Sequence, residues 1–269
     1  MRSIPIPDIQ SLPDSRNIPV DKVGVKGLRY PISVKDRRRG LQHTVGTFDL
    51  FVNLPHEFKG THMSRFIEVL DDYRDEISME KFQEILDKMK SKLNAQSAHM
   101  NVEFPYFMEK AATITATPGL MCYTCFMRGA LTSRFDLIVG VEVPVTTVCP
   151  CSKEIADYGA HNQRGLVRVQ LRFKKFFWIE EIIEMVESSV SCEIYSLLKI
   201  PDEKFVTEKA YQNPMFVEDV VRSAFDRLRA KNNFHWYKIE AENFESIHNH
   251  SAYASIEKDF SPQPECFPG

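Results

Sequence analysis

The chain has 269 residues, a formal net charge of −3 and an apolar fraction of 43%, which is the composition of an ordinary globular protein. The slight acidity argues against a general nucleic-acid-binding role. The sequence contains no run of about 18 apolar residues, so no membrane span is predicted. The N-terminal sequence lacks the apolar segment of a signal peptide. We therefore expect a cytoplasmic protein whose six cysteines are thiols or metal ligands rather than disulfides.

The predicted elements follow one another in a doubled order. Residues 1–40 are rich in proline and are expected to form an extended arm. Beyond them, alternation with period 2 predicts strands, and apolar residues at 3.6-residue spacing predict helices. The predicted strands are 43–55, 99–113, 119–131, 134–148, 166–173, 234–244 and 251–260, and the predicted helices are 64–73, 78–93, 176–198 and 213–230.

This order is two strands, two helices and two strands, found twice. Strands joined by short links pair antiparallel, and helices grouped between them cover one face, so the expected fold class is α+β. We expect an arm at 1–40, one unit at 41–135, a second unit at 136–260 and a tail at 261–269. The free edges of such sheets favour association into oligomers.

The residues with the most reactive side chains gather in TTVCPCSKEIADYGAHNQRG, residues 146–165. Cys149 and Cys151 are one residue apart, and the simplest interpretation is that one binds a metal and the other lines the site. His161 follows Cys149 by twelve positions, so a loop or short helix can bring it back. Thiolate and imidazole together suit zinc. Two buried thiols and a hydrogen-bonded histidine are the alternative.

A second cluster is ENFESIHNHSAYA, residues 242–254. His248 and His250 would share one face of a strand, and Glu245 precedes them. Paired histidines of this kind supply ligands or move protons. A solvated histidine and a core histidine are the alternative.

A third cluster is KGTHMSRF, residues 59–66, at the predicted start of a helix. His62 and Arg65 add donors to a natural anion site, whereas capping of the helix by Thr61 or Ser64 is the alternative.

Two further patterns carry weaker signals. Residues 202–219 hold several carboxylates, among them Glu203 and Glu218, most of which are expected to be solvated. Cys122 and Cys125 form a CxxC pattern among apolar neighbours and are predicted to be buried strand thiols.

Four of these segments, CPCSKEIADYGAHNQRG, KGTHMSRF, NPMFVEDVVR and ESIHNHSAYA, resemble the prokaryotic type IB GTP cyclohydrolases in sequence and order. The resemblance runs from about residue 20 to about residue 260. It implies the tunnelling fold, a β-β-α-α-β-β unit present twice per subunit, and a homotetramer. It also implies conversion of GTP and water to 7,8-dihydroneopterin triphosphate and formate, with zinc or manganese. This reaction is the first step toward tetrahydrofolate and, in many bacteria, queuosine.

The resemblance further implies a role for each candidate residue. The implied metal ligands are Cys149, His161 and Glu203. The implied catalytic groups are Cys149, Cys151, Glu245, His248 and His250. The implied substrate-binding residues are Glu218 at the guanine edge and His62, Arg65 and Lys153 toward the triphosphate.

Two other classes of protein stay open at this point. One is a different tunnelling-fold enzyme, such as an NADPH-dependent nitrile reductase, against which the CPC pair and the HxH motif argue. The other is a non-catalytic protein that binds a metal or a nucleotide. Metal binding without turnover of GTP would favour this last class.

Overall fold

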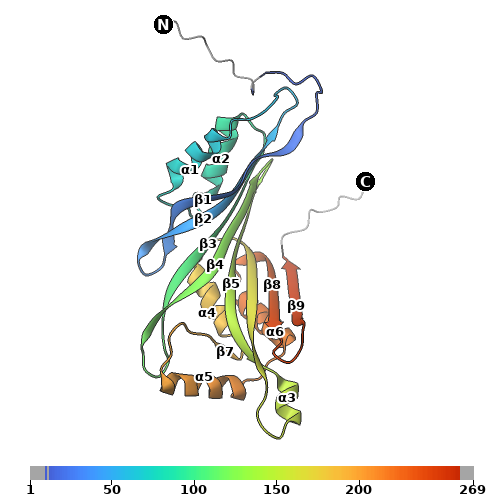
Figure 1. Cartoon of the computed structure of the whole chain (residues 1–269). Coiled ribbons are helices and arrows are strands. Elements are labelled where there is room, and N and C mark those ends of the chain that lie inside the picture. The colour runs from blue at the N-terminus through green and yellow to red at the C-terminus, as the bar shows by residue number, and fades with distance from the viewer. Residues whose placement is uncertain (1–9, 11, 261–269) are drawn as a thin grey trace. The chain divides into compact units, whose positions relative to one another are not determined.

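The computed structural model describes residue 10 and residues 12–260, so the expected tail and the first part of the expected arm lie outside it. In the described part, the chain forms nine strands and six helices (Figure 1). No helix there is long and apolar enough to cross a membrane. The described residues form two compact units. Unit 1 holds those up to Phe104 together with Phe126–Ile138, and unit 2 holds Pro105–Cys125 and those from Val139 onward.

The two units interleave along the sequence because three long strands contribute residues to both. These strands are β3 (Ala98–Ala111), β4 (Pro118–Leu131) and β5 (Phe135–Val148). All three were predicted within a few residues of their observed ends. The division into consecutive units at 41–135 and 136–260 stays a prediction.

Unit 1 begins with a long antiparallel hairpin of β1 (Val20–Asp36) and β2 (Gly40–Leu54). The prediction of an extended arm as far as residue 40 is therefore wrong from Val20 onward. Pro31 lies opposite Val45 within β1. A strand at the edge of a sheet tolerates proline because one row of its N–H groups has no ladder to join. The other four prolines of this region precede Val20.

Helices α1 (Ser64–Tyr73) and α2 (Phe82–Leu93) cover one face of the unit 1 sheet (Figure 1). The apolar stripe predicted for α2, from Phe82 to Leu93, is buried along its whole length. It packs together with Phe66 of α1 and Phe48 of β2, both fully buried. Helix α2 ends at Asn94, which has a positive φ of 51° and donates its N–H to carbonyls of the last turn.

Unit 2 is an antiparallel sheet with helices on one side. Its further strands are β6 (Asn162–Phe173), β7 (Cys192–Glu193), β8 (Phe234–Phe244) and β9 (Ser251–Asp259). Strand β5 pairs with β6, β6 with β8, and β8 with β9. The short β7 pairs with the end of β5, opposite Val145 and Thr146. The helices of unit 2 are α3 (Pro150–Ile155), α4 (Ile179–Glu187), α5 (Ile200–Gln212) and α6 (Val217–Lys231).

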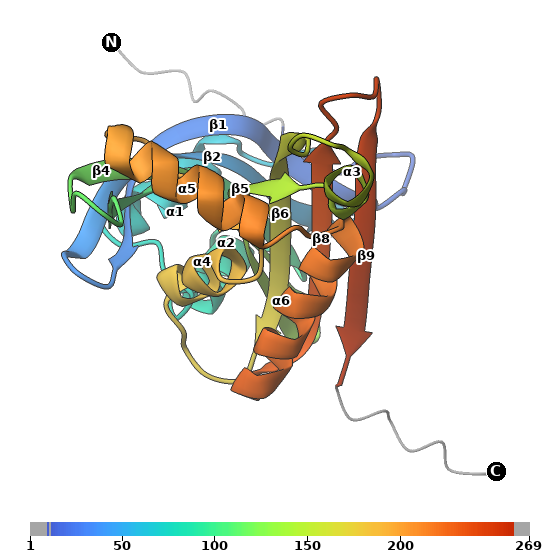
Figure 2. The same ribbon diagram turned by 90° about the horizontal axis from the view of Figure 1, so that it is seen from below.

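Helices α4 and α6 lie on the same side of β6, β8 and β9 (Figure 2). The single helix predicted over 176–198 is wrong, because the chain leaves the helix after Glu187. The hydroxyls of Ser188 and Ser189 bond back to the carbonyls of Glu184 and Met185, at 2.7 and 2.8 Å. Serines that bond to the preceding turn in this way compete with the helical ladder.

The segment between the two helices also differs from the prediction. Helix α5 was not predicted, and the helix expected from residue 213 begins only at Val217. Asp202 lies in the first turn of α5 and is fully buried, where its carboxylate accepts the Thr115 hydroxyl and the N–H groups of Ile114, Thr115 and Lys199. Burial raises the pKa of Asp202, but these hydrogen bonds outweigh it and bring the pKa to about 2. The carboxylate is thus a structural anchor and not a solvated acid.

Candidate active site

The two cysteines of the CPC motif occupy different environments at the end of β5. Cys149 caps α3 from an extended backbone, and its sulfur accepts the N–H of Ser152 at 3.4 Å. Pro150 takes the first helical position, where a missing N–H costs nothing. Cys149 is half-buried, whereas Cys151 on the first turn is exposed. Buried thiols, the alternative interpretation, are absent from this motif.

The chain returns after α3 and brings His161 beside Cys149. The N–H of Cys149 donates to the carbonyl of His161 at 3.1 Å. The N–H of His161 in turn donates to the hydroxyl of Ser152 at 3.2 Å. The sequence expectation that a loop or short helix brings these two residues together is confirmed. The Nδ1 atom of the His161 imidazole lies 3.0 Å from the side-chain amide Oε1 of Gln163.

The loop between β8 and β9 reaches the same histidine. The hydroxyl of Ser246 lies 3.3 Å from His161 Nδ1, and Ser246 follows Glu245 directly. The rings of His248 and His250 stack, with centroids 5.0 Å apart and planes 17° from parallel. Both lie on the exposed loop, so their predicted place on a strand face is wrong, although their side-by-side arrangement is observed. Neither is a core histidine.

A small apolar cluster joins the segments that carry the three expected metal ligands. Val148 packs with Cys192 and Ala210, and Ala160 and Val206 lie against them. Val148 precedes Cys149 and Ala160 precedes His161. Glu203 lies three residues before Val206 on α5 and so points to the same side of that helix.

The three side chains themselves do not converge in this structure. Among residue 10 and residues 12–260, no three His, Cys, Asp or Glu side chains form a group able to hold a metal ion. The apolar cluster joins the residues that precede Cys149 and His161 to Val206 of α5, whereas Glu203 lies three residues before Val206 and is exposed. Thiolate, imidazole and carboxylate are a donor set that fits zinc.

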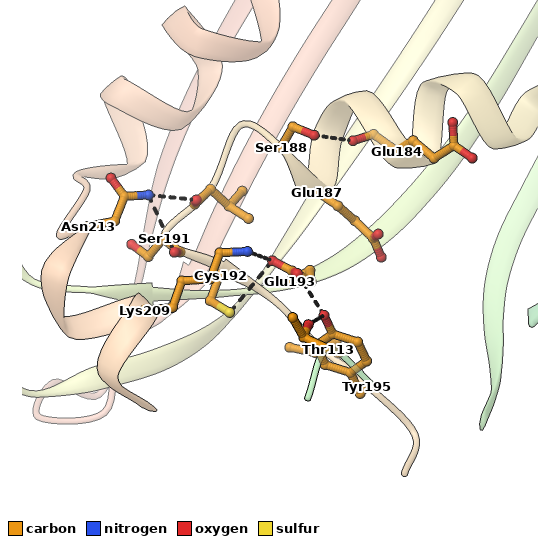
Figure 3. A network of polar contacts seen from close by, with 12 residues as sticks. Thr113, Glu184, Glu187, Ser188, Ser191, Cys192, Glu193, Tyr195, Lys209 and Asn213 are labelled. Atoms are coloured by element: carbon orange, nitrogen blue, oxygen red, sulfur yellow. Dashed lines mark hydrogen bonds and ion pairs between the residues drawn. The ribbon is translucent and has the colours of Figure 1, made fainter. Parts of the chain in front are cut away.

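The end of β5 is held by two segments that follow it much later in the sequence. The N–H of Val148 donates to the hydroxyl of Ser191 at 3.2 Å, and its carbonyl accepts the N–H of Met215 at 3.0 Å. The side chain of Asn213 donates to the carbonyls of Val190 and Ser191, at 3.0 and 3.4 Å (Figure 3). Three residues after Met215, the exposed Glu218 occupies the first turn of α6.

A second set of polar contacts joins β7 to α5. Lys209 of α5 binds the Glu193 carboxylate at 2.5 Å, and the Tyr195 hydroxyl donates to it at 2.7 Å (Figure 3). Burial raises the pKa of Glu193, but these two hydrogen bonds outweigh it and lower the pKa to about 2. Burial beside that carboxylate raises the pKa of Cys192 to about 12, so its thiol stays neutral.

The candidate phosphate-binding residues divide between the two units. Lys153 of unit 2 donates to the carbonyl of Tyr211 at 2.5 Å, and its ammonium lies 4.4 Å from the centre of that ring. His62 and Arg65 belong to unit 1, where Arg65 donates to the carbonyl of Lys92 at 3.2 Å. Helix α1 is capped by Met63 without a side-chain hydrogen bond, so capping by Thr61 or Ser64 is not observed.

Several residues of this neighbourhood carry no signal in the sequence. Ser191, Glu193 and Lys209 match no motif, and Asn213, although it begins the NPMFVEDVVR segment, was not singled out; the contacts across segments reveal all four. Gln163 lies inside the HNQRG stretch but was not singled out. In the CxxC pattern, Cys125 is buried as predicted whereas Cys122 is exposed, so half of that prediction is wrong.

The arrangement of sheets and helices defines the class of the protein. It is similar to that of uricase from Arthrobacter globiformis, with a TM-score of 0.54 at 9% identity over 92% of this chain and 96% of that chain. A highly active mutant of urate oxidase from Bacillus sp. TB-90 gives a TM-score of 0.53 at 8% identity, over 89% of this chain and 100% of that chain. The fold is the tunnelling fold, an antiparallel sheet with helices on one face, as predicted.

Sequence comparison narrows this class to one family. A family model described as "Type I GTP cyclohydrolase folE2" matches residues 6–254, and the chain belongs to this family. GTP cyclohydrolase FolE2 of Syntrophus aciditrophicus is 58% identical over 94% of this chain and 99% of its own length. The protein of the same name from Desulfosudis oleivorans is 59% identical over 93% of this chain and 96% of its own length.

Proposed function

We propose that this chain is a type IB GTP cyclohydrolase I, which hydrolyses GTP to 7,8-dihydroneopterin triphosphate and formate. The observation that carries the proposal is the meeting of two motif segments at His161. The CPC turn bonds to its backbone, and the loop of Glu245 reaches its imidazole through Ser246. Full-length similarity to proteins named GTP cyclohydrolase FolE2 supports the same reaction. Its product leads to tetrahydrofolate and, in many bacteria, to queuosine.

The donor set proposed for a zinc or manganese ion is Cys149, His161 and Glu203. A divalent ion held by these residues would lower the pKa of a bound water and so supply a nucleophile near neutral pH. The half-buried Cys149 and the backbone-anchored His161 are already side by side. Glu203 is exposed and lies three residues before Val206, which packs against the apolar cluster beside Cys149.

The remaining groups serve the substrate. Hydration at C8 of guanine, opening of the imidazole ring and loss of formate all need proton donors and acceptors at nitrogen and oxygen. The exposed pair His248 and His250, with Glu245 at the start of the same loop, is proposed to move these protons. Cys151, exposed beside the turn of Cys149, is proposed to meet the substrate.

Four residues are proposed to bind the substrate. The carboxylate of Glu218 can accept the N1–H and 2-amino donors of guanine as a charge-assisted pair. His62, Arg65 and Lys153 are proposed for the triphosphate. The exposed start of α6 suits Glu218 for this role, since an exposed carboxylate is open to a ligand.

Association into homotetramers and a cytoplasmic location are also proposed. In the part of the chain that the structure describes, β9 pairs only with β8, and its other edge carries no partner strand. An unpaired edge of nine residues is a template for pairing with another copy.

The test is turnover of GTP by protein loaded with zinc or manganese. We expect formate release and a pterin that fluoresces after oxidation, both abolished by a chelator and restored by the metal. Oxidation of NADPH with a nitrile substrate serves as the control for a reductase. Folded, metal-loaded protein that leaves GTP intact refutes the proposed function.

A further inference from the structure

A buried polar chain leads from β5 to the His161 ring. Thr147 of β5 lies opposite Gln163 of β6 in the antiparallel ladder. The Gln163 amide Nε2 donates to the Thr147 hydroxyl at 3.0 Å, and its Oε1 lies 3.0 Å from His161 Nδ1. Thr147 is 0% exposed and Gln163 is 6% exposed, so the contact between them is buried, whereas the contact of Gln163 with His161 is partly buried. The backbone of Gln163 is held as well, because Thr146 donates to its carbonyl at 3.2 Å.

The row of hydrogen bonds from Thr147 through Gln163 to His161 shows which end of the Gln163 amide faces the histidine. An amide has one donor end and one acceptor end. In this structure the Nε2 end of the amide faces the Thr147 hydroxyl, and the Oε1 end faces His161 Nδ1. An acceptor oxygen requires a proton on Nδ1. In a neutral imidazole the other nitrogen, Nε2, then carries the lone pair that a metal ion needs.

The exposed hydroxyl of Ser246 is the competing partner. It lies 3.3 Å from the same Nδ1, farther than the Gln163 oxygen at 3.0 Å. The Ser246 hydroxyl can donate or accept and rotates to suit, whereas the buried amide presents its oxygen to the ring in this structure. The amide therefore decides the position of the proton, and Ser246 adapts to it.

We propose that Gln163, oriented by Thr147, is a positioning residue that holds His161 in the Nδ1–H tautomer and so leaves Nε2 free to bind the metal ion. The inference rests on the proposed function, because it assumes that His161 is a ligand. Hydrogen bonds of this kind to the second nitrogen of a ligand histidine orient the ring and raise its basicity. No sequence motif identifies Gln163 for this role.

The first experiment measures zinc affinity by competition with a chromophoric chelator. Gln163→Leu keeps the volume but has no acceptor, so zinc should bind about 10–100-fold more weakly. Gln163→Glu keeps an acceptor toward Nδ1–H, and its affinity should stay within about threefold of wild type or tighten. If Gln163 only fills space, the order reverses, because leucine is tolerated and a buried carboxylate is not. That reversal, or equal affinity in all three proteins, overturns the proposal.

Two further variants control for folding and for Ser246. Gln170 lies on the same strand, is 8% exposed and bonds to Glu240, so Gln170→Leu removes a comparable buried amide and should leave zinc affinity unchanged. Ser246→Ala should also leave it unchanged. If Ser246→Ala weakens zinc binding while Gln163→Leu does not, Ser246 sets the tautomer and the proposal is wrong. Far-ultraviolet circular dichroism verifies that each variant is folded.

The second experiment needs neither metal nor GTP. Nitrogen-15 NMR of histidine-labelled, metal-free protein at pH 8 reports directly which ring nitrogen of His161 is protonated. We expect the Nδ1–H tautomer in wild type and a shift toward Nε2–H in Gln163→Leu and in Thr147→Val. A wild-type ring with its proton on Nε2 overturns the inference. If His161 has the expected tautomer but the metal-loaded protein does not turn over GTP, the proposed function is overturned and the inference about the tautomer stands.

Discussion

The carboxylate of Glu193 should make the stability of this protein depend on pH in acid. Its side chain is 15% exposed and binds Lys209 and Tyr195, which hold its pKa near 2 against an ordinary value of 4.5. A carboxyl with a lowered folded-state pKa stabilises the folded state above pH 4.5. That contribution is lost as the pH falls toward 2. We therefore choose Glu193→Gln, which removes the charge and keeps an acceptor for Tyr195.

The size of the effect follows from the shift in pKa. A shift from 4.5 to about 2 corresponds to about 3.4 kcal/mol at about 1.36 kcal/mol per pKa unit, fully present at pH 7. Lys209 is 40% exposed, so solvent screening reduces this value. We expect Glu193→Gln to lower the free energy of unfolding by about 1–3 kcal/mol at pH 7. Roughly half of that difference should be gone by pH 3.

Urea unfolding curves at pH 7, 5, 4 and 3 measure this difference. The matched control is Glu208→Gln, on the same helix as Lys209. It breaks an exposed ion pair in which the Glu208 side chain is 54% exposed and the Lys204 side chain 74% exposed. That substitution should change stability by less than about 0.5 kcal/mol at every pH. A loss in Glu193→Gln that is the same at pH 7 and pH 3 would refute the electrostatic reasoning and leave only a packing effect.

The remaining predictions concern the site and its scaffold. Cys149→Ala should lose bound zinc and Cys151→Ala should retain it, since only the first is proposed as a ligand; metal analysis showing the reverse would exchange the two roles. Glu218→Ala should weaken GTP binding by about 1.5–3 kcal/mol in calorimetric titration, because a charge-assisted partner is lost, while unfolding stays unchanged. Unaltered GTP affinity would remove Glu218 from the site. Gly165→Ala should destabilise the fold by about 1–3 kcal/mol, since the new Cβ would lie 2.7 Å from the buried Asn243 amide oxygen. A wild-type unfolding midpoint would show that Asn243 can move.

Periodicity predicted the strands and the helices with clear apolar stripes, and it failed where the stripe is weak. Helix α1 was predicted with its observed ends, since Phe66, Val69 and Leu70 repeat at helical spacing. Helix α5 was missed because only Asp202 and Ala210 are buried along it. The helix predicted through residue 198 extended α4 beyond Ser188, where apolar residues continue but the serine hydroxyls take the helical carbonyls.

The motifs of the site could be found in the sequence, but the contacts that arrange them could not. A loop that returns from Cys149 to His161 is foreseeable from a separation of twelve residues. The bond from Asn213 to Ser191 joins positions 22 apart across a helix that was not predicted. The role of Gln163 depends on the direction of an amide, which follows from its neighbours in space and leaves no pattern along the chain.

The segments that close around the end of β5 are synthesised well after it. Met215, whose N–H binds the carbonyl of Val148, follows Cys149 by 66 positions. At about 5–20 residues per second, the ribosome needs roughly 3–13 s to make that stretch. During this interval the segments that close around the end of β5 are not yet made, and an oxidant can reach the sulfur of Cys149 as readily as the exposed sulfur of Cys151. The demand for a reducing environment is therefore greatest on the growing chain, before Cys149 is half-buried.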